Sequence, residues 1–179
     1  MGSDPAFKFK TAFALAMVLS FGKLPLSVSA LGESVPTKIA VFDFELVDAS
    51  AGAGVAGDPD VDANYLSAVN MEVRRVVEES GRYRLIDVSG ADAEAARNHS
   101  LRHCNGCEAK IAAALGADQS LLGTVKRISR TEYVVGYELR EAKSGTLIAA
   151  EDTGLRMGAG YSWSRGASRL IATHLLGVR

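Results

Sequence analysis

The stretch that decides the fold is Lys38 to Leu46, with the sequence KIAVFDFEL. The alternation of a strand predicts one face made of Ile39, Val41 and Asp43 and an opposite face made of Ala40, Phe42 and Phe44. Apolar residues on both faces are typical of a strand that is covered on both sides. We therefore expect a layered fold in which helices pack on both faces of a sheet that contains this strand.

A helix is expected after a loop rich in Gly, Ala and Asp. Asp62 is a plausible N-cap, and the helix should run to about Glu79, where Gly81 fits the left-handed stop position. Apolar residues at helical spacing predict its buried stripe, which consists of Leu66, Val69, Val73, Val76 and Val77.

The rest of the chain predicts further elements in a mixed order. We expect a strand over 82–88, a short helix over 91–98, a helix over 107–115, three antiparallel strands over 119–129, 131–141 and 146–157, and a final helix over 161–176. This order predicts an α/β (α+β) fold with a mixed sheet of about five strands, an antiparallel meander in its C-terminal half, and helices packed on its faces.

Residues 1–30 have the layout of a secretory signal peptide. Lys8 and Lys10 precede the apolar run from Thr11 to Phe21, and small residues end the segment at Val28 and Ala30. The run is shorter than the roughly 20 apolar residues that span a bilayer. We expect cleavage after Ala30, a single domain over 31–179, and no stable membrane insertion after cleavage; the alternative is an uncleaved anchor.

The charge of the expected mature domain argues against nucleic-acid binding. The whole chain has 20 basic and 21 acidic residues, and the first 30 hold three basic residues and one acidic residue. The remainder therefore has 17 basic and 20 acidic residues, a net charge of −3. A nucleic-acid protein would show a concentrated basic excess instead.

Three segments of the chain together carry a resemblance to a known family: KIAVFDFEL at 38–46, CNGCEAKIAAALGADQSLLGTVKRIS at 104–129, and LRMGAGYSWSRGASRLIATHLL at 155–176. They resemble a family of secreted or periplasmic proteobacterial proteins of unknown function. The chain is more distantly similar to the N-terminal domain of TolB and to the periplasmic domain of the curli secretion protein CsgG. The resemblance implies an α/β fold and a periplasmic or secreted setting in a Gram-negative bacterium, and it implies no defined activity.

Cys104 and Cys107 form the sharpest local motif, C-N-G-C. In an oxidising compartment two such cysteines tend to pair. One interpretation is a disulfide that pins the start of the 107–115 helix. The alternatives are a thiol–disulfide redox site, since a helix N-terminus lowers the pKa of a cysteine, and a metal site that adds His99 and His103.

Asp43 and Glu45 are candidates for a ligand surface because they follow the first strand. Ligands of α/β proteins often bind at the carboxyl ends of strands. With the aspartates at 58, 60 and 62, these acids could also bind a cation, although the loop lacks the glycine and the bidentate glutamate of a calcium loop. We predict no defined metal site and no cofactor.

The C-terminal region offers a second, weaker set of candidates for a partner surface. Arg165 and Arg169 are four residues apart on one face of the expected final helix, Arg156 lies shortly before it, and Trp163 lies within it. No set of nucleophile, base and orienting residue is evident. The sequence favours a non-enzymatic, exported accessory protein that binds an envelope partner; the alternatives are a redox or sensing protein and a small metal-binding protein.

Overall fold

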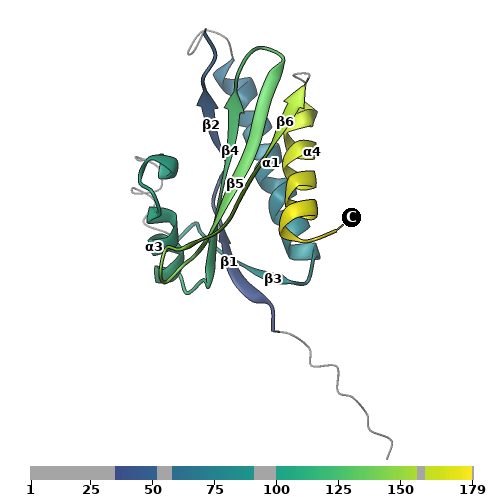
Figure 1. The fold of residues 1–179 in the computed structure, drawn as a ribbon. Coiled ribbons are helices and arrows are strands. Elements are labelled where there is room, and N and C mark those ends of the chain that lie inside the picture. Colours follow the sequence, from purple (N-terminus) through teal and green to yellow (C-terminus); the bar gives the residue numbers. More distant parts are fainter. Residues whose placement is uncertain (1–34, 52–57, 91–99, 157–159, 179) are drawn as a thin grey trace, which may run out of the picture. The chain divides into compact units, whose positions relative to one another are not determined.

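The computed structural model describes residues 35–51, 58–90, 100–156 and 160–178. The predicted class is confirmed, since a mixed six-stranded sheet carries helices on both faces (Figure 1). No helix in these described ranges is both long enough and apolar enough to cross a membrane.

The sheet has the strand order β3-β1-β4-β5-β6, and β2 pairs with β4 beyond the end of β1. The strands are β1 (Thr37–Val41), β2 (Glu45–Asp48), β3 (Tyr83–Ile86), β4 (Gln119–Arg127), β5 (Glu132–Glu141) and β6 (Leu147–Arg156). Strands β1 to β4 pair in parallel, and β4, β5 and β6 form the predicted antiparallel meander.

The helices divide between the two faces. Helices α1 (Pro59–Glu79) and α4 (Gly160–Leu170) cover one face, and α4 continues as a π-helical turn, η2 (Ile171–Leu175). The short 3₁₀ turn η1 (Leu101–His103) and α3 (Cys107–Ala114) lie on the other face (Figure 1). We call these the α1/α4 face and the α3 face. The short helix predicted over 91–98 lies outside the described residues.

The predicted strand 38–46 is wrong in one respect, because it breaks into β1 and β2. Val41 is opposite Leu121 of β4, but Glu45 is opposite Thr124, so four steps along one strand match three along the other. Because of the extra residue, side chains after the break point to the opposite face of the sheet from the one that simple alternation predicts. Phe44, expected beside Phe42, instead packs in the α1/α4 core, while Phe42 lies in the α3 core.

Two side chains of α1 satisfy backbone groups at this break. Asn70 accepts a hydrogen bond from the N–H of Phe44 (2.8 Å), and Arg74 donates one to the carbonyl of Val41 (3.2 Å). The ring of Phe44 lies over Gly123, where a Cβ atom would overlap with it. Residue 123 must therefore be a glycine because the Phe44 ring lies so close to its Cα atom, and not because of its backbone conformation.

The start of α1 also differs from the prediction. Asp58, not Asp62, is the N-cap, and its side chain accepts hydrogen bonds from the N–H groups of Asp60 and Val61. Pro59 fits the first helical position, where no N–H is needed, and this draws the helix start forward. The predicted apolar stripe is confirmed, with Val69, Val73 and Val77 buried.

Replacing Gly123 by Ala tests the packing at the break. A methyl group would push the Phe44 ring out of place, so we expect Gly123→Ala to lower the free energy of unfolding by about 1–3 kcal/mol, measured by urea denaturation. The matched control is Gly154→Ala on β6, where the space is open and we expect a change within about 0.5 kcal/mol. Equal losses in the two variants would contradict the packing.

Candidate functional site

Glu45, the first residue of β2, anchors the segment that leads into α3. Its carboxylate accepts hydrogen bonds from the hydroxyl of Ser100, from the backbone N–H of Leu101 (2.6 Å) and from Nη1 of Arg102 (2.9 Å). The side chain of Glu45 is 17% exposed. Because both of its oxygens are engaged within the chain, Glu45 holds η1 in place and is not a free acid.

Asp43, two residues earlier, has a different environment. Its side chain is 70% exposed, and its carboxylate is 2.8 Å from Nη2 of Arg74 on α1. Asp43 therefore forms a surface ion pair with α1, whereas Glu45 binds η1. The two carboxylates predicted to act together are engaged with different elements.

A hollow of about 780 Å³ lies where β1 and β3 end, and its lining includes Asp43, Arg74 and Asp87. The connection to β3, on one side of β1, runs through α1 on one face of the sheet. The connection to β4, on the other side of β1, runs through α3 on the other face, so the strand order reverses its direction at β1. Ligands of open α/β sheets bind at such positions. The pKa of Asp87 is lowered here, because the backbone N–H and the hydroxyl of Ser89 donate hydrogen bonds to its carboxylate.

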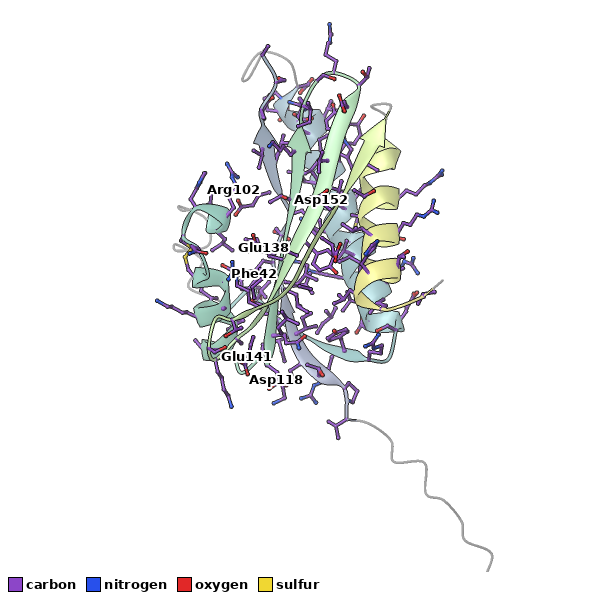
Figure 2. The ribbon with its side chains drawn as sticks, in the orientation of Figure 1. Phe42, Arg102, Asp118, Glu138, Glu141 and Asp152 are labelled. Carbon is purple, nitrogen blue, oxygen red and sulfur yellow. A yellow bond between two sulfur atoms is a disulfide. The ribbon has the colours of Figure 1, made fainter. Side chains whose placement is uncertain are left out.

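A second hollow, about 550 Å³, lies between η1, the start of α3 and strands β4 to β6. We call it the open-face groove; its charged lining includes Arg102, Lys126, Glu138 and Asp152. Figure 2 labels three of these side chains, which come from η1, β5 and β6. Gly136 lies between Thr124 and Asp152 in the floor, where the absence of a side chain deepens the groove.

Glu108 of α3 is buried at the edge of this groove. It is 2% exposed, and its Oε1 is 2.9 Å from Nε of Arg140 on β5. Arg140 also contacts Glu138 (2.7 Å) and donates to the carbonyl of Gly145 (3.2 Å). Among the described residues, Oε2 of Glu108 has no hydrogen-bond partner. The pair ties α3 to the sheet.

Cys104 and Cys107 are bonded to each other, with their Cα atoms 5.7 Å apart. Cys104 follows η1 directly, and Cys107 is the first residue of α3. Between them Asn105 (φ 42°) and Gly106 (φ 102°) adopt left-handed backbone conformations, which glycine adopts freely and asparagine adopts more readily than most other residues. The bond thus spans the turn between η1 and α3.

A third charged cluster, on the α1/α4 face, was missed at the level of sequence. Arg127 is 4% exposed and contacts Asp48 of β2 (3.0 Å) and Asp62 of α1 (2.7 Å). Its guanidinium carbon lies 5.8 Å from the ring centre of Tyr133. The available signal was the position of Arg127 in β4, where alternation from Leu121 and Val125 predicts an inward side chain.

The pKa values of Asp48 and Arg127 are shifted in this cluster. The hydroxyl and backbone N–H of Ser50 lower the pKa of Asp48 to about 2, with a smaller contribution from Arg127. Burial lowers the pKa of Arg127, but hydrogen bonds with Asp62, Tyr133 and Asp48 outweigh it and raise the pKa overall. Asp48 and Arg127 therefore stay charged at neutral pH, and the cluster links β2, β4 and α1.

The candidates from the C-terminal region do not form one surface. Trp163 is 2% exposed and packs against Tyr65 and Tyr133, so it belongs to the core and not to a partner surface. Arg165 and Arg169 lie on α4, and Arg165 lines a shallow hollow beside α1. The side chain of Arg156 lies outside the described residues.

The histidines and acids proposed as metal ligands do not gather in the described part of the chain. There, no three His, Cys, Asp or Glu side chains lie close enough together to hold a metal ion. Asp58 caps α1, Asp62 binds Arg127, and His103 ends η1. His99 lies outside the described residues.

The sequence matches the family model DUF3280, described as a protein of unknown function (DUF2380), over residues 37–175. The chain belongs to this family. No curated protein matches it in sequence.

Several solved structures are similar to this DUF3280 protein. The hypothetical protein CT253 from Chlamydia trachomatis is 12% identical, with a TM-score of 0.50 over 80% of this chain and 97% of that chain. The C-terminal domain of LpoB from Salmonella enterica is 16% identical, with a TM-score of 0.48 over 72% of this chain and 88% of that chain. TolB from Acinetobacter baumannii is 16% identical, with a TM-score of 0.42 over 79% of this chain and 29% of that chain.

These matches bear on the predicted resemblances. TolB is among the similar structures, and the family is one of unknown function. The similarity to CsgG stays a prediction. At these identities the likeness concerns the fold alone.

The anchoring role of Glu45 can be tested against its neighbour. We expect Glu45→Ala to lower the free energy of unfolding by about 1–3 kcal/mol, because three donors lose their acceptor. Asp43→Ala removes only an exposed ion pair, and we expect a loss below about 1 kcal/mol. Urea denaturation gives both values, and hydrogen exchange should quicken at Leu101 in the first variant alone. Similar losses, or unchanged exchange at Leu101, would exclude the anchoring role.

Proposed function

We propose that this protein is an exported accessory protein of the bacterial cell envelope, which acts by binding a partner protein and not by catalysis. The observation that carries the proposal is the unequal covering of the sheet. Among the described residues, the α1/α4 face has two long helices over it, whereas the α3 face is covered at one end by η1 and α3. In this described part of the chain, the open-face groove lies on the rest of the α3 face.

The groove has the character of a binding surface. Its lining mixes apolar residues such as Ile128 and Val134 with the charges of Lys126, Glu138 and Asp152. Interfaces between proteins combine apolar contact with polar groups that orient the partner. In the described residues of the groove, no nucleophile is paired with a base and an orienting residue.

In this proposal the Cys104–Cys107 bond has a structural role. Arg102 and Leu101 line the groove from η1, and the bond joins the residue after η1 to α3. Together with the three hydrogen bonds to Glu45, it keeps the wall of the groove in place before a partner arrives. A binding surface that is already ordered loses less conformational entropy on association.

The proposed export of the protein rests on the N-terminal segment, residues 1–30. Lys8, Lys10 and the apolar run to Phe21 have the layout of an export signal. An exported compartment is also where a disulfide between Cys104 and Cys107 persists.

Photo-crosslinking in intact bacteria tests the proposal. A photoreactive residue replaces Lys126 in the groove, and the control places it at Met71, which is 66% exposed on α1. We expect the position at 126 to give one defined crosslinked product in the periplasmic fraction and the position at 71 to give none.

Two results would overturn the proposal. One is the same set of products from both positions, which would mean that the groove has no preferred partner. The other is the absence of a product from position 126 and from a second groove position, Glu138. Recovery of the protein only from the cytosol would contradict the proposed export.

A further inference from the structure

The free edge of the sheet adjoins the open-face groove. Strand β6 pairs with β5 on one side, and within the described residues no other strand pairs with it. It runs for ten residues, whereas β3, at the opposite edge, has four. A long unpaired edge presents a row of backbone N–H and C=O groups that can pair with another chain.

The side chains of β6 carry negative charge at the middle of this edge. Glu151 and Asp152 are consecutive, so they point to opposite faces of the sheet. Asp152 lines the open-face groove and forms no ion pair in the described structure, and Glu151 faces His174 of η2 at 3.6 Å while remaining 46% exposed. Glu138 of β5, which is opposite Ala150, is a third carboxylate and lies on the groove face with Asp152, where it is paired with Arg140 (2.7 Å).

The same charges disfavour a second copy of this chain as the occupant. In a two-fold antiparallel pairing centred on β6, either Glu151 lies opposite Glu151 or Asp152 lies opposite Asp152. Like charges directly opposite each other destabilise a strand pair. A strand with basic residues at the matching positions would instead form favourable pairs on both faces.

We propose that β6 is the docking edge for an extended segment of a partner protein that carries two consecutive basic residues. The added strand extends the sheet, and its two cations meet Glu151 on the α1/α4 face and Asp152 on the groove face. Main-chain hydrogen bonds supply affinity, and the paired charges set the register. This inference rests on the proposed function, since it names the chemistry of the partner and the edge on which it binds.

Two synthetic peptides test the inference on the purified protein. Both are nine residues long and rich in Thr and Val; one has Lys-Lys at its centre and the other Glu-Glu. We expect the lysine peptide to bind and to slow hydrogen exchange at amides within 147–156. We expect the glutamate peptide to bind at least about tenfold more weakly, because two attractive pairs become repulsive.

A charge reversal separates edge pairing from general attraction to an acidic protein. In the variant Glu151→Lys, Asp152→Lys, we expect the preference to reverse, so that the glutamate peptide now binds more tightly. The matched control, Glu78→Lys on α1, reverses an exposed carboxylate away from β6 and should leave the preference unchanged.

Three results would overturn the inference: equal binding of both peptides, protection of β3 rather than β6, and a dimer of the free protein that pairs through β6. If the lysine peptide does not bind while crosslinking from position 126 succeeds, the inference fails and the proposed function stands. If the peptide binds and crosslinking fails, the edge docks a strand, but the groove is not the surface used by the partner.

Discussion

The arrangement of this protein depends on one extra residue between β1 and β2. Val41 and Glu45 are four residues apart, but their partners on β4, Leu121 and Thr124, are three apart. Because side chains alternate along a strand, this single offset exchanges the two faces for Phe44 and the residues of β2. It turns Phe44 into the α1/α4 core and Glu45 towards η1.

The charged anchors on the two faces follow from this exchange. Glu45 reaches Leu101 and Arg102, and so fixes the segment that walls the open-face groove. Asp48, three residues later, points the other way and meets Arg127 beside Asp62 of α1. One strand therefore ties η1 to one face of the sheet and α1 to the other, and the groove keeps its shape between fixed elements.

The sequence predicted most elements because their signals are local. The stripe of Val69, Val73 and Val77 and the alternation in β4 to β6 depend on neighbours within a few residues. The break at 42–44 could not be predicted in this way, because its cause is distant in sequence. Gly123 leaves room for Phe44, and Asn70 receives its N–H. For the same reason the sequence indicated Glu45 as a site residue but not its partner at Leu101, and it missed the burial of Glu108. The burial of Arg127 did have a local signal, the alternation along β4.

The most direct test is to measure on which face of the sheet the Phe44 ring lies. In NMR spectra of the purified protein, nuclear Overhauser effects report which protons lie near the ring. We predict contacts from the Phe44 ring to the α-protons of Gly123 on β4. Contacts from the ring to Leu101 or Ala112, which belong to the α3 core, would mean that β1 and β2 form one regular strand and would contradict the account.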